Sequence, residues 1–232
     1  MVAGLLVVVP PLAGLARTYE VLDAVQFAAL ALAVPALVAL GAPWGRLGAI
    51  GALATRRAAR RAARGTRLVV APLVAEVAAV VVWRTTGVVD AFQRHHGLVA
   101  LEALTLVAAG LWLWTELVAS PPLAPRSLPL WRMVLATVAM WSLWVVAYVA
   151  GMAHAGYPGF GHTASSALSA DADRQAATAV LFVAGAIAYL PVVFANLFGW
   201  LRAEERRGDE DTVRRLRSGV LGVSREDARP VH

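Results

Sequence analysis

The chain has no cysteine and no lysine, and charged residues make up only 16% of its 232 residues. The lack of cysteine excludes disulfide scaffolds, thiolate metal sites and cysteine nucleophiles. Hydrophobic residues make up 59%, which excludes intrinsic disorder and lies outside the range of ordinary soluble domains. A soluble chain of this size cannot bury so many apolar side chains in one core. The composition therefore predicts an all-α, polytopic membrane protein.

Recognisable catalytic motifs are also missing from the sequence. It has no phosphate-binding glycine loop, no serine elbow and no paired carboxylates in a known arrangement. We therefore expect that the protein is not an enzyme. The basic residues, all 21 of them arginine, lie between long apolar runs rather than among exposed aromatics on a soluble domain. That pattern is typical of a topology signal, and we expect no nucleic-acid partner.

Apolar runs long enough to cross a bilayer recur along the chain, since a spanning helix needs about 20 mostly apolar residues. The first candidate contains two prolines and lacks the positive n-region of a signal peptide, so we interpret it as a retained span, with cleavage as the alternative. The second is interrupted by Pro35. A charged tail follows at 201–232. The six predicted spans are 1–16, 20–43, 68–84, 95–118, 130–151 and 174–200.

The arginines predict the orientation of these spans. Seventeen of them lie in the 45–67 segment, the loop before the fifth span and the tail, whereas four lie on the opposite side. Because arginine-rich loops stay in the cytoplasm, both termini are predicted to be cytoplasmic. The run at 54–67 is predicted to be a short helix that lies on the anionic surface of the lipid bilayer.

Ionisable residues inside spans are costly, so they are candidates for a functional site. Glu76 falls in the third span and Glu102 in the fourth. Four histidines fall on the predicted outer side, and imidazole with carboxylate suits copper(II) or zinc. Ordinary interfacial histidines and hydrogen-bonded interhelical glutamates are the alternatives. The candidate metal ligands are Asp23, His95, His96, Glu102, His154 and His162.

Further polar residues lie on or beside the predicted spans. Asp23 and Gln26 share one face at the outer end of the second span, and Asp173 and Gln175 open the sixth. One interpretation is an interior face that joins helices by hydrogen bonds, and the other is a polar path towards the outer site. The candidate polar site comprises Gln26, Glu76, Asp173 and Gln175.

Five blocks of sequence carry a resemblance to a known family. They are PPLAGLAR at 10–17, VLDAVQFAALALAVPALVALGAPW at 21–44, VVVWRTTGVVDAF at 80–92, LEALTLVAAGLWLW at 101–114 and DRQAATAVLFVAGAIAYLPVVFANLFGWLRAEER at 173–206. In order and spacing they resemble the CtaG-type cytochrome c oxidase assembly factors of bacterial plasma membranes. The resemblance implies a multi-pass location in that membrane and a role in building the respiratory chain.

The resemblance also implies copper delivery through outer histidines at helix ends. At the corresponding positions this chain carries Asp23, Phe27, Arg84 and Ala103 instead. His95 and His96, one helical turn nearer the outer side, are candidates to replace the missing imidazoles. The alternative is that the protein is a paralogue with a different function. Residues that match the family pattern are Gln26, Trp83, Asp90, Glu102, Asp173 and Gln175.

Three functions are consistent with this sequence. We expect an assembly factor for a respiratory oxidase that handles copper at its outer face and contacts oxidase subunits. A metal-independent membrane scaffold for the same subunits is the first alternative. A transporter of small molecules or ions is the second, and it would need Glu76 and Glu102 to line a water-accessible cavity.

Overall fold

The fold is taken from a computed structural model, and part of the chain is described. The predicted span at 1–16 and the candidate ligands His95, His96, His154 and His162 lie outside the described residues. Side chains are described as far as residue 210. The described residues are 19–46, 48, 51–53, 56, 70–85, 87–88, 97–123, 125, 127–152 and 168–226.

Helices make up the described structure, which contains no named strand, so the predicted all-α class is confirmed. The chain first forms one rod from α3, η1 and α4, and a short 3₁₀ turn, η2, follows it. The bounds are Glu20–Ala28 for α3, Ala29–Ala33 for η1, Val34–Gly41 for α4, Pro43–Arg46 for η2, Ala71–Trp83 for α6, Gly97–Leu117 for α8, Pro129–Met152 for α9 and Ala170–Glu226 for α10.

Four of the described helices are long and apolar enough to cross a membrane. They cover Glu20–Gly41, Leu98–Leu117, Pro129–Met152 and Ala170–Glu210. The remaining apolar helix, α6, has only 13 residues, a rise of about 20 Å against a hydrocarbon core of about 30 Å. The described part of α6 is therefore shorter than the hydrocarbon core is thick.

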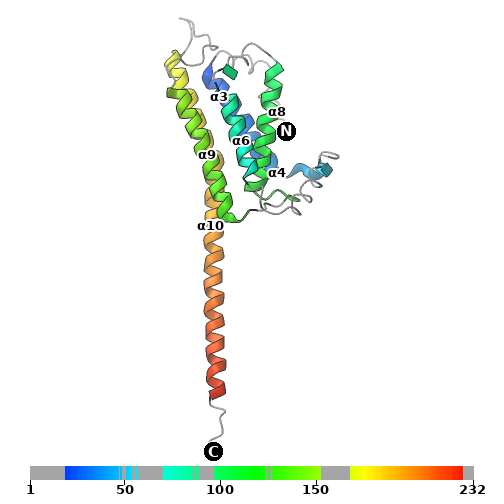
Figure 1. Cartoon of the computed structure of the whole chain (residues 1–232), viewed down its shortest axis with the longest axis vertical. Coiled ribbons are helices and arrows are strands. Elements are labelled where there is room, and N and C mark those ends of the chain that lie inside the picture. The colour runs from blue at the N-terminus through cyan, green and yellow to red at the C-terminus, as the bar shows by residue number, and fades with distance from the viewer. Residues whose placement is uncertain are drawn as a thin grey trace, which may run out of the picture.

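The bundle has apolar side chains both inside and outside. α10 packs along α9 and against α3, while α6 packs on α8 and α9 (Figure 1). Leu106 and Leu113 of α8 are fully buried at the centre. Leu104 and Ile187 are 68% and 71% exposed on the outside. Large apolar side chains on the outer surface of several helices are what a lipid-facing surface requires.

A proline inside the first rod explains its π-helical turn. Pro35 has no N–H to donate to the Ala31 carbonyl, and its ring clashes with that carbonyl in a regular α-helix. The helix instead forms a wider π-helical turn, in which the N–H of Val34 donates to the carbonyl of Ala29, five residues back. At this turn α8 comes very close, because a Cβ on Gly110 would lie 2.7 Å from the Ala31 oxygen. Only glycine fits there without a shift of the backbone.

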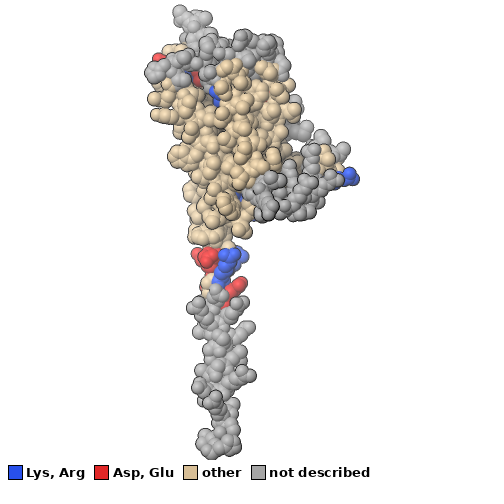
Figure 2. Space-filling view, in the orientation of Figure 1, with Lys and Arg blue, Asp and Glu red and all other residues tan. Residues whose placement is uncertain are grey.

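α10 continues as one helix far beyond the rest of the bundle. Within α10 no charged residue lies between Arg174 and Arg202, and basic and acidic residues follow from Arg202 onward (Figure 2). The helix runs for 57 residues in total, so the predicted charged tail extends the last span without a break as far as Glu226.

Candidate functional site

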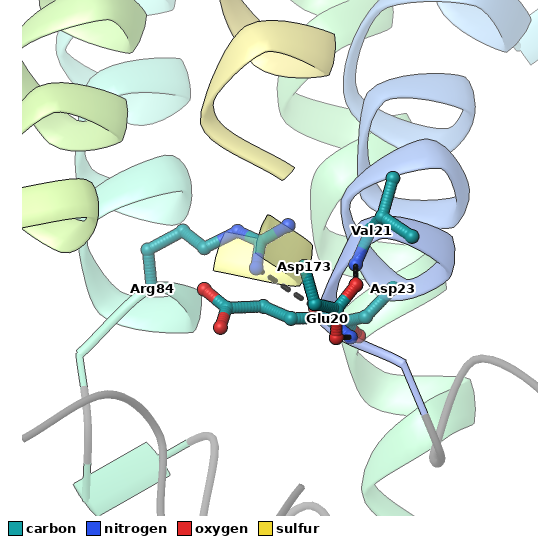
Figure 3. Close-up of polar contacts among 5 residues, drawn as sticks. All are labelled: Glu20, Val21, Asp23, Arg84 and Asp173. Carbon is teal, nitrogen blue, oxygen red and sulfur yellow. Dashed lines mark hydrogen bonds and ion pairs between the residues drawn. The ribbon is translucent and has the colours of Figure 1, made fainter. Parts of the chain in front are cut away.

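Polar residues from four helices meet at the end of the bundle where α10 begins. Asp173 of α10 is fully buried and caps the first turn of α3. Its Oδ2 accepts the N–H of Glu20 at 2.7 Å, and its Oδ1 accepts the N–H of Val21 at 3.0 Å (Figure 3). The residue before the helix, Tyr19, gives no side-chain cap, so another helix supplies the acceptor. A carboxylate there is also favoured by the helix dipole.

Arg84 joins α6 to α3 beside this cap. It lies at the C-terminal end of α6, where the helix dipole favours a cation. Its Nη1 donates to Oδ2 of Asp23 at 2.8 Å, and the two side chains are only 3% and 13% exposed. The guanidinium carbon also lies 4.2 Å from the centre of the Phe27 ring, which is a cation–π contact. Arg84 is therefore held by a charge and by an aromatic face of the same helix.

The preceding residue fixes the end of α6 against α8. Trp83 is buried, and its Nε1 donates to the Thr105 hydroxyl at 2.8 Å. One turn before Thr105, the side chain of Glu102 is buried close enough to Asp23 and Arg84 for their charges to act on it. The third and fourth predicted spans therefore both deliver a polar residue to the same place.

The resulting group, which we call the charged end, has more acids than bases. Arg84 and Asp173 both act on the charge of Glu20, which is itself buried. Carboxylates therefore surround one deeply buried guanidinium. The members of the charged end are Glu20, Asp23, Arg84, Glu102 and Asp173.

The structure brings some of the predicted site residues together and separates others. Asp23, Glu102 and Asp173 meet at the charged end, and Gln26 is buried one turn further along α3. Gln175 is exposed on α10, although it lies only two residues from the buried Asp173.

Glu76 is buried as well, but it lies two turns before Arg84 on α6 and lines a separate cavity. The two polar groups therefore form separate sites within the described residues.

Two members of the charged end did not emerge from the sequence as site residues. Glu20, Asp23 and Phe27 are spaced by three and four, so they share one helix face, and this spacing was the available signal. Arg84 was counted as a topology signal and as a replacement for a histidine of the family pattern, but not as a site residue. Its position after an apolar run gave no indication that the side chain would turn inward to a carboxylate 61 residues away.

The charged end does not fit a copper ion. No group of three or more histidines, aspartates and glutamates that could hold a metal is found within the described ranges. One oxygen of Asp23 binds Arg84, and both oxygens of Asp173 accept backbone N–H groups. The positive charge of the Arg84 guanidinium beside these oxygens would repel a bound metal cation. The predicted ligand Asp23 therefore already has a cationic partner from the chain itself.

Apolar outer surfaces on four helices long enough to cross a membrane, with a buried ion cluster at one end, define a polytopic helical membrane protein. The chain matches the family of the cytochrome c oxidase caa3 assembly factor (Caa3_CtaG) over residues 1–203, and it belongs to this family. The resemblance predicted from the five sequence blocks is thus confirmed. Searches of curated proteins and of solved structures found no match.

Proposed function

We propose that this chain supports cytochrome c oxidase assembly as a metal-independent membrane scaffold, in a bacterial plasma membrane and without catalysis. The observation that carries the proposal is the ion pair between Arg84 and Asp23, reinforced by the Phe27 ring. These three residues take the places where the family resemblance implies imidazoles. They link α3 to α6, which is a structural role. Family membership over residues 1–203 supports the connection with the oxidase.

A groove between the first rod and α10 offers this scaffold a contact surface. It has a volume of about 800 Å³ and is lined mostly by apolar side chains, many of them alanines. Small residues allow helices to approach closely in a membrane. A helix about 10 Å across would fill this volume over about two turns. The alanines that line the groove are Ala28, Ala29, Ala33, Ala36, Ala184, Ala188 and Ala195.

The buried glutamates favour a scaffold over a transporter. Glu76 lines a cavity of only about 10 Å³, and Glu102 lines neither that cavity nor the groove. Both side chains are packed among helices, at 2% and 7% exposure. A transporter would need them to share a path for its substrate. Copper bound by the four histidines outside the described residues stays a prediction.

One experiment separates the scaffold from copper handling. Cells that lack the chain would be complemented with the wild type or with a variant in which His95, His96, His154 and His162 are all alanine. The scaffold predicts equal amounts of assembled oxidase, measured by its haem absorbance in membranes. If the variant fails and added copper restores the oxidase, copper handling is the function instead.

The groove is tested by site-directed photocrosslinking, for which a chain without cysteine is well suited. A benzophenone would be attached to a cysteine at Ala33 or Ala188, both in the groove. The matched control is Leu104, which is 68% exposed on α8. We expect adducts with an oxidase subunit from the groove positions alone. Equal adducts from Leu104, or adducts with lipid only, would refute the groove as the contact surface.

A further inference from the structure

Glu76 has no hydrogen-bonding partner among the described residues. It lies on α6 between two buried apolar residues of the same helix, Leu73 and Val80. Its side chain is 2% exposed, and neither Oε1 nor Oε2 has a partner within the described part of the chain. A buried polar side chain normally finds such a partner in protein or in bound water. Something other than the described side chains must therefore satisfy this carboxyl group.

The carboxyl group borders a small cavity between three helices. The cavity has a volume of about 10 Å³ for the centre of a water molecule, which is the lower limit for holding one. Tyr189 of α10 and Ser142 of α9 contribute its other polar groups. The remaining walls are apolar: Leu32, Val77, Val80, Ala139 and Leu143. One water would thus meet three polar groups, which is the usual number for a buried water.

The hydrogen-bonding chemistry of the three groups is complementary. The Ser142 hydroxyl donates to the carbonyl of Val138 at 2.8 Å, so towards a water in the cavity its oxygen can act only as an acceptor. The phenol of Tyr189 can donate or accept. Its ring is stacked on Trp114 with centroids 5.8 Å apart, which fixes the direction of the hydroxyl. Water supplies two donors and two acceptors, so it can serve all three groups together.

The surroundings favour the neutral form of Glu76. Arg84, the cation nearest in sequence, is committed to Asp23 at the charged end, two turns further along α6. No charged side chain is among the residues that share the cavity with Glu76. An ionised carboxylate in such an apolar site would lack compensation for its lost hydration. A neutral carboxylic acid instead supplies one donor and one acceptor.

We propose that Glu76 is a neutral carboxylic acid that binds one water molecule together with Tyr189 and Ser142, and so joins α6, α9 and α10 in the middle of the bundle. The site does not depend on the proposed assembly function, because none of its polar residues belongs to the charged end or lines the groove; the two cavities share only the apolar wall residue Leu32. It gives the membrane interior a polar junction in addition to the Trp144 indole of α9, which donates to the Phe182 carbonyl of α10 at 3.0 Å.

Infrared difference spectroscopy on the full chain in lipid nanodiscs tests the proposal. The wild type minus Glu76→Gln spectrum should show the C=O band of a carboxylic acid and no carboxylate band, and the band should shift in D₂O. Glu204→Gln is the matched control, since Glu204 is 59% exposed, and it should remove a carboxylate band instead. A carboxylate band in the Glu76 difference spectrum would overturn the proposal.

A second variant tests the shared water and does not depend on the folding of Glu76→Gln. Tyr189→Phe keeps the ring stacked on Trp114 and removes only the hydroxyl. Because the carboxyl group and the phenol share the water, the carboxylic acid band should move in this variant. Ser142→Ala should move it as well. An unmoved band in both variants would show that no water links these groups, and the proposed site would be wrong.

Discussion

Breaking the ion pair of the charged end should strongly destabilise the bundle. Arg84→Met removes the cation and keeps most of the apolar stem, which leaves Asp23 partly buried and unpaired. Removing one partner of a buried pair costs about 3–5 kcal/mol. Because Asp23 is 13% exposed, we expect about 3 kcal/mol for the pair, with about 1 kcal/mol more for the lost contact with Phe27.

A double-mutant cycle isolates the pair from the other contacts of Arg84. Asp23→Asn alone removes the carboxylate that binds the guanidinium, while the double variant removes both charges of the pair. We expect the double variant to be at least 2 kcal/mol more stable than the sum of the two single effects, a coupling within the usual range for contacting residues. The free energy of unfolding would be measured by denaturation in mixed detergent micelles.

The control for this cycle is an exposed pair on α10. Arg207 donates to Glu204 at 3.2 Å, with side chains 70% and 59% exposed. Arg207→Met should change the free energy of unfolding by less than about 0.5 kcal/mol, since water screens such pairs. If Arg84→Met is equally harmless, or if the Asp23 and Arg84 effects simply add, the ion pair does not hold α3 to α6 and our reasoning about the charged end fails.

Three other outcomes are expected, two from the structure and one from the sequence. Asp173→Ala should lower the free energy of unfolding by about 2–4 kcal/mol, because two N–H groups of α3 lose their acceptor, and Asp173→Asn should recover about half of the loss. Gly110→Ala should destabilise by about 1–3 kcal/mol in the same micelle assay, whereas Gly199→Ala, with open space around it, should not. Reporter fusions at His232 and within 54–67 should report the cytoplasm, and one within 156–170 the outside; the reverse pattern would refute the arginine count.

The helices could be predicted from the sequence because each apolar run carries its own signal. The runs at 95–118 and 130–151 correspond to α8 and α9 within two residues at each end. The length of α10 was harder to predict, since the polar tail has no apolar run, and the helix continues through it to Glu226. Local composition thus determines where a membrane helix lies, but it does not determine where a helix in water ends.

The charged end was only half predictable. Asp23, Glu102 and Asp173 could be selected because ionisable residues beside apolar runs are rare. Two contacts could not be predicted: the cap that Asp173 forms on another helix and the position of Arg84 over Phe27. Both depend on how the helices pack, which the residue spacing within one helix does not encode. The π-helical turn was marked by Pro35 only as an interruption. Its fit to Gly110 of α8 required the structure.

The single helix α10 belongs both to the membrane domain and to the charged segment beyond it. From Leu201 to Glu226 it rises about 39 Å, more than the thickness of the hydrocarbon core. A tilt of about 5° at the bundle would displace the far end by about 3 Å. Asp173 binds the other end of this helix to the first turn of α3. A small change in the angle between α3 and α10 would therefore appear as a larger lateral displacement at the far end of α10.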